Sequence, residues 1–493
     1  MEKAIGCINI EQYSKSIYDF IIKYKTIILI TFIIGVVVNA VDIFTIKFGV
    51  DSELYTLENS PQIYFDTQRY GSWLLYYLLP FARYHIISQL TGLFVLTIAS
   101  LLTISRHNIS NNAKLLFMVL FITYPNFAFL QYFYFQSAYN FIGLLFTVIA
   151  YRLIEKNNII AYIIAVVLLF IGISSYQANA AVFLSVMMIN IILDYINEKN
   201  IKQAIICIFK AVLFLVLSLV IYYILIKIFA GNFNSFHSSS IRYQASIIDN
   251  IGNLITYLYR ILISYADNSK HTANIVVSII LIISFIYILI KHYKEKYYLF
   301  LILLVIGFIF AFLSLNIFLG GFITVRAEIA NGFYPAFILM LVYVYSNKLK
   351  LLLSVIAVCI VFYHASYIVQ CQMSYYMTYK QDETTAKDII SKIYNKYPEI
   401  LEKNYNINII GIMKKNTPHP LLKSSGIFEV SFFKWVKDQR RMVSFMKLFG
   451  FPMDVKLGKI TDNMKKEIKT MPSYPSNDCV KLIGDTVVVK LSD

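Results

Sequence analysis

Charged residues are scarce in this chain, and their scarcity excludes an ordinary soluble fold. Asp, Glu, Lys and Arg make up only 15% of the 493 residues, whereas 58% are hydrophobic. The mean hydropathy is +0.64. No soluble domain needs so much apolar surface, but a protein with many membrane spans does. The composition therefore predicts a polytopic membrane protein.

The motifs of nucleotide, metal and nucleic-acid binding are also missing from the sequence. There is no Gly-rich phosphate loop, and the histidines lack the spacing of metal ligands. No basic amphipathic helix or aromatic-basic pattern suggests nucleic acid. Five cysteines form no disulfide framework, although Cys371 and Cys479 fall on one side of the predicted topology and could pair. We expect no metal, no cofactor and no nucleic-acid partner.

Long apolar runs are what the chain does have, and eleven of them can cross a membrane. A span of a roughly 30 Å hydrocarbon core needs about 20 residues. The first run follows a lysine-containing segment, 1–25, and is too long for the core of a signal peptide, so we expect an uncleaved signal anchor. The short apolar segment 72–82 is predicted to be interfacial or re-entrant. The predicted spans are 26–48, 86–104, 113–130 (interrupted by Tyr124-Pro125), 136–153, 159–174, 178–195, 204–229, 273–290, 297–318, 330–346 and 351–369.

Lysine and arginine are concentrated in alternate short loops, and this pattern orients the spans. It accounts for much of the net charge of +16. The N-terminus and the loops that carry Arg106, Arg152, Lys199, Lys294 and Lys348 are predicted to be cytoplasmic. The opposite loops are predicted to be periplasmic, and they are 49–85, 131–135, 175–177, 230–272 and 319–329.

With an odd number of spans, residues 370–493 are expected on the periplasmic side. This tail has a helix-like run at 382–396 and strand-like runs at 407–412 and 485–491. About 120 residues can bury a modest core. We therefore expect a transmembrane domain at 26–369, with its first periplasmic loop at 49–85, and a small α/β periplasmic domain at 370–493.

The first periplasmic loop contains the strongest candidates for chemistry. Asp51 and Glu53 stand where the first span should leave the membrane, and Asp66 and Arg69 follow in the same loop. The spacing of two aims both acids the same way on an extended backbone, but not on a continuing helix. Sugar transfer to a hydroxyl needs a carboxylate base and a cation on a departing phosphate. The alternative is a solvated acidic loop neutralised by Arg69.

Two further periplasmic loops contribute candidate substrate contacts. Arg326 and Glu328 stand at the mouth of a span, and arginine is suited to bidentate phosphate binding. The alternative is a local ion pair between them. Tyr176 and Gln177 belong to a tight polar turn, SSYQ at 174–177, which can contact substrate or merely connect two helices.

The motifs GVDSE…RYGSW at 49–73, SSYQ and the terminal MPSYPSNDCVKLIGDTVVVKL at 471–491, in this order, resemble the bacterial O-antigen glucosyltransferases of the Gtr type. The resemblance is to the glucosyltransferase II branch, which is involved in serotype conversion, and it covers essentially the whole chain. It implies an all-α polytopic membrane enzyme of the GT-C type in the bacterial inner membrane, with a periplasmic C-terminal domain.

The resemblance also implies substrates and partners. The donor is undecaprenyl-phosphate-glucose, and the acceptor is lipid-linked O-antigen of lipopolysaccharide or a related surface polysaccharide. A small flippase and a donor-making glycosyltransferase are the implied accessory partners. An acid in the first periplasmic loop acts as the base, which maps onto Asp51 or Glu53, and the sugar inverts at its anomeric carbon.

Other classes of membrane protein stay open at this point. A polysaccharide flippase or transporter should have internal repeats and charged residues at the membrane midplane, whereas here no repeat is visible and the charges cluster at one face. An O-antigen polymerase or a protein-modifying mannosyltransferase would have the same kind of fold but would join different substrates.

Overall fold

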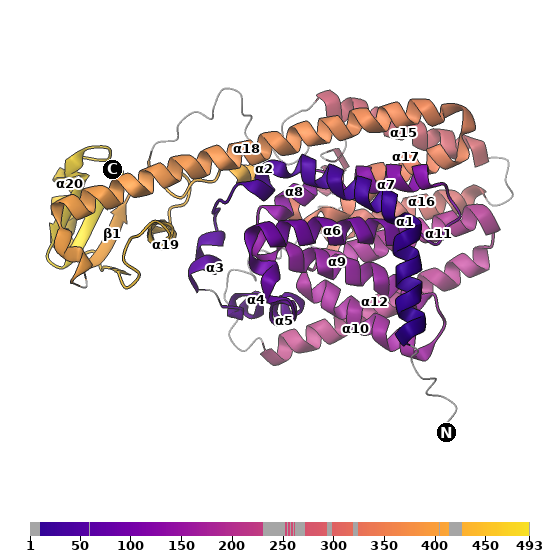
Figure 1. The fold of residues 1–493 in the computed structure, drawn as a ribbon, viewed down its shortest axis with the longest axis horizontal. Coiled ribbons are helices and arrows are strands. Elements are labelled where there is room, and N and C mark those ends of the chain that lie inside the picture. The colour runs from indigo at the N-terminus through magenta and orange to yellow at the C-terminus, as the bar shows by residue number, and fades with distance from the viewer. Residues whose placement is uncertain are drawn as a thin grey trace, which may run out of the picture.

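A helical bundle and a small C-terminal domain are joined by one very long helix in the computed structural model (Figure 1). The structure describes residues 10–58, 60–229, short pieces between 252 and 261, 272–292, 298–318, 324–403, 405–413 and 426–492. The bundle is helical wherever it is regular, and the described strands all lie in the C-terminal domain.

Eleven helices of the bundle correspond to the eleven predicted runs. Seven of them are long and apolar enough to cross a membrane: α1, α6, α9, α11, α12, α16 and α18. The other four, α7, α10, α15 and α17, contain shorter apolar segments, so the count of eleven spans stays a prediction. Their bounds are α1 Ile10–Val38, α6 His85–Ile104, α7 Asn111–Ile122, α9 Tyr134–Ile154, α10 Ile159–Ser175, α11 Asn179–Glu198, α12 Ile201–Phe229, α15 Thr272–His292, α16 Tyr298–Phe318, α17 Phe333–Tyr345 and α18 Lys350–Lys396.

Short helices fill the connections at one end of the bundle. They are α2 (Ala40–Phe44), α3 (Ser52–Glu58), α4 (Gln62–Asp66), α5 (Tyr70–Leu78) and α8 (Asn126–Gln131). The predicted interruption at Tyr124-Pro125 is confirmed, because α7 ends just before it and α8 begins just after it. Proline has no amide hydrogen to donate inside a helix. Segment 72–82 forms α5 and a 3₁₀ turn, too short to span.

The first predicted span, 26–48, has different bounds in the structure. The helix begins earlier, at Ile10, and ends at Val38. Asn39 stops it with a non-helical backbone (φ −103°, ψ 15°), and Gln372 donates a 2.9 Å hydrogen bond to the Asn39 side chain. The chain then turns through α2, which packs against α6 and α18. Residues 39–50 therefore form a bend that delivers the first loop to the end of the bundle.

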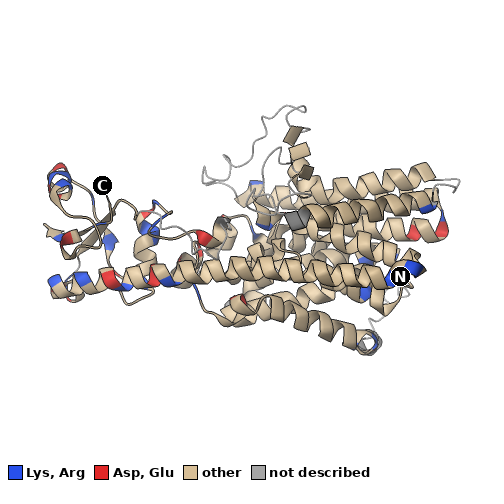
Figure 2. Cartoon of the chain, turned by 90° about the horizontal axis from the view of Figure 1, so that it is seen from above, with Lys and Arg blue, Asp and Glu red and all other residues tan. Residues whose placement is uncertain are grey.

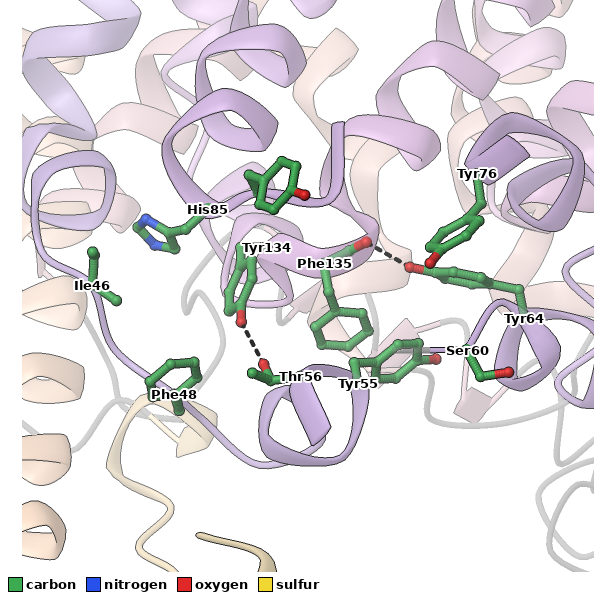
Figure 3. A pocket seen from close by; sticks show the side chains of 11 residues that line it. Ile46, Phe48, Tyr55, Thr56, Ser60, Tyr64, Tyr76, His85, Tyr134 and Phe135 are labelled. Atoms are coloured by element: carbon green, nitrogen blue, oxygen red, sulfur yellow. Dashed lines mark hydrogen bonds between the residues drawn. The ribbon is translucent and has the colours of Figure 1, made fainter. Parts of the chain in front are cut away.

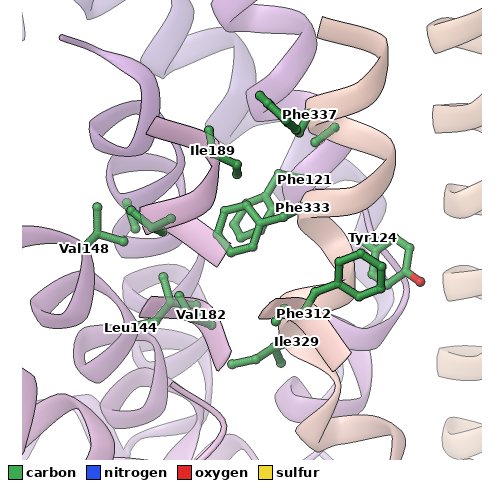
Figure 4. Packing of buried hydrophobic residues seen from close by; sticks show 14 of the residues in the cluster. Phe121, Tyr124, Leu144, Val148, Val182, Ile189, Phe312, Ile329, Phe333 and Phe337 are labelled. Carbon is green, nitrogen blue, oxygen red and sulfur yellow. The ribbon is translucent and has the colours of Figure 1, made fainter. Parts of the chain in front are cut away.

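The bundle core is built from interlocking aromatic and aliphatic side chains. Figure 4 shows Phe121 against Phe333, whose ring centroids are 4.4 Å apart, with Val182 and Ile329 close by. Close helix approach depends on small residues. A Cβ built on Gly71 of α5 would lie 2.2 Å from the carbonyl oxygen of Ile171 in α10. Only glycine lets α5, and with it the first loop, pack this closely on the bundle.

Helix α18 runs along the bundle and continues without a break into the C-terminal domain (Figure 1). Its 47 residues span about 70 Å at 1.5 Å per residue. It joins the predicted span 351–369 to the predicted helix 382–396. Its buried side chains belong to the bundle core as far as Tyr375 and to the C-terminal core from Tyr379 onward.

The C-terminal domain packs a small sheet against α18 and two short helices, α19 (Gln439–Lys447) and α20 (Asp462–Thr470). The strand order is β2-β1-β4-β3, parallel except for the β3–β4 pair. The predicted strands at 407–412 and 485–491 are confirmed as β1 and β4. Cys371 lies in the bundle core and Cys479 in the C-terminal core, and no disulfide joins them, so the pair considered above is not formed. The strands are β1 Asn406–Ile410, β2 Lys456–Leu457, β3 Val480–Ile483 and β4 Thr486–Lys490.

Candidate active site

Charged residues are found mainly toward the ends of the bundle rather than along its length (Figure 2). At one end, Arg106 forms ion pairs with Glu155 and Asp194, and Arg152 pairs with Glu155 at 2.9 Å. These contacts join three of the loops that were predicted to be cytoplasmic. The described parts of four predicted periplasmic loops, 49–85, 131–135, 175–177 and 319–329, meet at the opposite end, where the candidate site lies.

Asp51 and Glu53 share one partner, Arg441 of the C-terminal domain. One guanidinium nitrogen of Arg441 lies 2.6 Å from Asp51 Oδ1, and the other lies 3.0 Å from Glu53 Oε1. Asp51 has φ +82° and directly precedes α3. This left-handed conformation, which aspartate tolerates better than most residues, turns both acids toward the same cation. The bundle and the C-terminal domain therefore meet at the two candidate acids.

Glu53 is the more unusual of the two acids. Its side chain is 0% exposed, compared with 36% for Asp51, and its Oε2 has no hydrogen-bond partner among the described residues. Burial raises the pKa of Glu53 to about 7, although Arg441 acts to lower it, and Asp51 adds a smaller upward push. A carboxylate with a pKa near neutrality and a free oxygen is suited to accept a proton.

A cavity of about 360 Å³ lies beside α3 (Figure 3). Thr56 follows Glu53 by three positions on this helix, so the two side chains share a face. The Thr56 hydroxyl lies 3.0 Å from that of Tyr134, and Tyr64 donates a 2.6 Å hydrogen bond to the carbonyl oxygen of Phe135. The wall is mostly aromatic rings and hydroxyl groups, contributed by Ile46, Phe48, Tyr55, Thr56, Ser60, Tyr64, Tyr76, Tyr84, His85, Tyr134 and Phe135.

A buried ion pair fixes the segment that leads into the acids. Lys47 lies 2.7 Å from Asp42, and both side chains are almost fully buried. Gln89 of α6 donates 2.8 Å hydrogen bonds to Asp42 and to the carbonyl oxygen of Gln131. Lys47 also lies 4.9 Å from the ring centre of Tyr375. A buried pair persists only when such additional contacts satisfy it, so residues 42–47 are held firmly against α6 and α18.

The predicted cations Arg69 and Arg326 converge on Tyr176. Arg69 lies over the Tyr176 ring, 5.6 Å from its centre, and the electrostatic environment of the Tyr176 hydroxyl includes Arg326, Arg69 and Glu328. Four residues from three separate loops, all predicted as substrate contacts, thus lie together. Within the described residues, Arg326 stacks on the ring of Phe133 at 4.3 Å instead of forming an ion pair with Glu328.

The other two predicted substrate contacts make local interactions. Asp66 accepts a 2.9 Å hydrogen bond from Gln62 on the exposed side of α4. Gln177 donates to the hydroxyl of Tyr222, which donates in turn to the carbonyl oxygen of Gln68. Gln177 therefore connects α12 to the first loop, and Asp66 is not brought to the acid pair.

Four consecutive aromatic residues, 132–135, at the junction of α8 and α9 link the acids, the cavity and the cations. The Tyr132 hydroxyl accepts a hydrogen bond from the amide of Val50 next to Asp51. Phe133 lies under Arg326, and Tyr134 and Phe135 line the cavity. Sequence reasoning missed these residues and also Arg441. The aromatic run in the outer loop 131–135 was the one available signal.

Metal binding receives no support from the described part of the chain. No group of three or more His, Cys, Asp or Glu side chains there is arranged to hold a metal ion. The described residues at this end of the bundle bring together carboxylates, guanidinium groups and hydroxyls.

Together, the fold and the site define a class of protein. It is a helical membrane protein that has acids, arginines and an aromatic cavity at one end of its bundle. Residues 43–343 match the sequence model of the glucosyl transferase GtrII family. The match covers more than half of the chain, so the protein belongs to this family of glucosyltransferases, as the resemblance implied. It includes the first loop, Tyr176 and Arg326 but ends before α18 and Arg441. No curated protein and no solved structure matches the chain.

Proposed function

We propose that this glucosyltransferase moves a glucosyl group from undecaprenyl-phosphate-glucose to lipid-linked O-antigen, or to a related surface polysaccharide, on the periplasmic face of the bacterial inner membrane. The observation that carries the proposal is Glu53, a buried carboxyl group beside an aromatic cavity, whose pKa is about 7 and whose Oε2 has no hydrogen-bond partner among the described residues. A base of this kind is what transfer of a sugar to a hydroxyl requires.

The proposed reaction is a single displacement. Glu53 Oε2 removes the proton from an acceptor hydroxyl as the acceptor oxygen attacks the anomeric carbon. The bond between that carbon and the phosphate oxygen breaks, and the lipid phosphate leaves with the electron pair. The anomeric carbon inverts. Arg69 and Arg326 are the cations proposed to stabilise the negative charge that grows on the phosphate.

Arg441 and Asp51 are positioning residues in this scheme. The guanidinium of Arg441 engages Glu53 Oε1 at 3.0 Å, which leaves Oε2 available for the acceptor. Asp51 holds the other guanidinium nitrogen and so fixes the orientation of Arg441. A bidentate contact restricts geometry more than a single hydrogen bond does.

Several features support a donor that arrives through the bilayer. The bundle is covered with exposed apolar side chains, and the described loops at the Arg106 end are short. They leave no room for a nucleotide-binding fold. A flippase and a donor-making glycosyltransferase would supply such a donor on the periplasmic side.

An assay with labelled donor tests the proposal. Membranes that contain the protein are incubated with labelled undecaprenyl-phosphate-glucose and lipopolysaccharide. Label that enters the polysaccharide one glucose at a time supports the proposed transfer. Longer polysaccharide without added glucose would instead indicate a polymerase, and label that crosses the membrane without transfer would indicate a transporter.

A further inference from the structure

The cavity beside α3 differs in kind from a second large cavity formed by described residues of the bundle. A groove of about 570 Å³ between α1, α7, α17 and α18 is lined almost wholly by aliphatic and aromatic carbon, as a bilayer-facing groove would be. The cavity beside α3 combines five tyrosines with Thr56, Ser60 and His85. Its lining therefore suits a ligand that has both apolar faces and hydroxyl groups.

A pyranose ring is a ligand of this kind. Its C–H faces are apolar and pack against aromatic rings, while its hydroxyls donate and accept hydrogen bonds around the edge. In the cavity, Tyr55 and Phe135 stack with ring centroids 3.7 Å apart, and the Thr56 and Tyr134 hydroxyls meet at 3.0 Å. Figure 3 shows these rings and hydroxyls on one side of the cavity and His85 with Ile46 on another.

The cavity also lies beside the proposed base. Thr56 is three positions after Glu53 on α3, and this places both side chains on one helix face. Glu53 is moreover close enough to Tyr134 to act on its hydroxyl electrostatically. A sugar held against Thr56 and Tyr134 would thus lie next to Glu53. Cavities of a few hundred Å³ with convergent polar groups are typical of small-ligand sites.

We propose that this cavity is a hexopyranose-binding subsite, in which aromatic rings hold the face of the sugar and Thr56, Ser60 and the tyrosine hydroxyls hold its edge. The inference rests on the proposed function for the role of Glu53 but concerns binding. The hexose can be the glucosyl group of the donor or a residue of the acceptor polysaccharide, and the experiment separates the two.

The first arm measures binding alone. Purified full-length protein in sugar-free lipid nanodiscs is probed with methyl glucopyranoside by saturation-transfer NMR. Tyr84→Ala removes a ring that is 56% exposed, and Thr56→Val removes one hydroxyl with little change of shape. The matched control is Tyr223→Ala on α12, a tyrosine that is 58% exposed and is not part of the cavity lining.

Wild-type protein and the control should give a clear transfer signal, and Tyr84→Ala and Thr56→Val should weaken it about 10-fold, the equivalent of about 1.4 kcal/mol. Unchanged binding by both variants, with folding verified by melting temperature, would overturn the subsite. Binding is observed whether or not glucose is transferred, so failure of the proposed function is distinguishable from failure of this inference.

The second arm identifies the source of the sugar. If the cavity holds the glucosyl group of the donor, the variants raise KM for undecaprenyl-phosphate-glucose and leave KM for the acceptor unchanged. If the cavity holds a residue of the acceptor, the variants raise KM for the acceptor and leave KM for undecaprenyl-phosphate-glucose unchanged. Equal KM values for both substrates in variants and wild type would contradict the subsite in either form.

Discussion

Glu53 and Asp51 have the same functional group but occupy different environments, and the difference predicts different roles. Both acids pair with Arg441, but Glu53 is buried and its Oε2 has no hydrogen-bond partner among the described residues, whereas Asp51 is partly exposed. Glu53→Gln keeps the shape and removes the charge, so turnover should fall by about 10²–10⁴-fold. Asp51→Asn should lower turnover less, because Asp51 acts on the reaction through Arg441. Glucose transfer, normalised to membrane-inserted protein, measures both. Near wild-type turnover in Glu53→Gln would move the base to another residue.

The environment of Glu53 also predicts how turnover depends on pH. The base works only when ionised, and its pKa is raised to about 7 by burial. Turnover should therefore rise with pH through about 7 and then level off. Arg441 favours the ionised form, while Asp51 opposes it and Tyr132 and Tyr134 face the same site. Arg441→Gln should shift the acid limb to higher pH.

Arg440 provides a matched control for that shift. It is adjacent to Arg441, its side chain is 76% exposed, and it pairs with Asp438 instead of the acids. The profile of Arg440→Gln should coincide with that of the wild type. An Arg441→Gln profile that also coincides would show that Arg441 does not influence the catalytic acid.

Arg326 is the subject of a third residue-scale prediction about the reaction. Its guanidinium lies over the Phe133 ring, an arrangement in which its planar shape matters as well as its charge. Arg326→Lys should lower turnover although the charge remains. Arg326→Ala should lower it further, by about 10²–10³-fold if the contact with phosphate is made in a site shielded from water. A role only in surface packing would leave turnover normal in both variants at matched protein levels.

Which of these residues could be predicted from sequence depends on how local their signals are. Arg69, Tyr176 and Arg326 lie in loops assigned to one side by the pattern of lysine and arginine, so their proximity follows from topology. Arg441 is 388 positions from Glu53, and nothing in its surroundings marks which basic residue of the tail contacts the first loop. Tyr132 and Tyr134 resemble any interfacial aromatic belt.

At the scale of the element, the apolar runs predicted the helices well but not their ends. The run 26–48 looks continuous, yet its helix ends at Val38. The polar residues that stabilise the bend, Asn39 and Asp42, find their partners on α18 and α6. Such tertiary contacts leave no trace in local hydropathy. The same limit applies to α18, whose polar middle gave no sign that the helix continues.

The hydrogen bonds of Asp382 on α18 lead to a prediction about the stability of the C-terminal domain. This buried carboxylate accepts hydrogen bonds from the Ser431 hydroxyl and the Phe432 amide. Asp382→Ala would leave these donors without their acceptor, at a cost of about 1–3 kcal/mol. The unfolding temperature of the C-terminal domain should fall, and the domain should become more sensitive to protease. Lys387→Ala, on an exposed face of the same helix, is the control and should change neither.

At the scale of the whole molecule, the described loops between the long helices lie at one end of the bundle or the other. Arg106, Glu155 and Asp194 meet at one end, and Arg69, Tyr176 and Arg326 lie at the other. The C-terminal domain contacts the second end through Arg441. The candidate site and the C-terminal domain must therefore face the same side of the membrane, whichever side that is.

The excess of lysine and arginine at the first end predicts that this end is cytoplasmic, so residues 370–493 are expected in the periplasm. Alkaline phosphatase is active only after export, and it should be active when fused after Val369 and inactive when fused near Lys294. A fusion at the C-terminus should agree with the fusion after Val369, because no helix after α18 in the described part of the tail is long and apolar enough to cross a membrane. An active fusion near Lys294, together with inactive fusions at both other points, would show that the membrane topology is the reverse of the predicted one. The acids, the cavity and Arg441 would then face the cytoplasm, where a lipid-linked donor on the periplasmic side could not reach them.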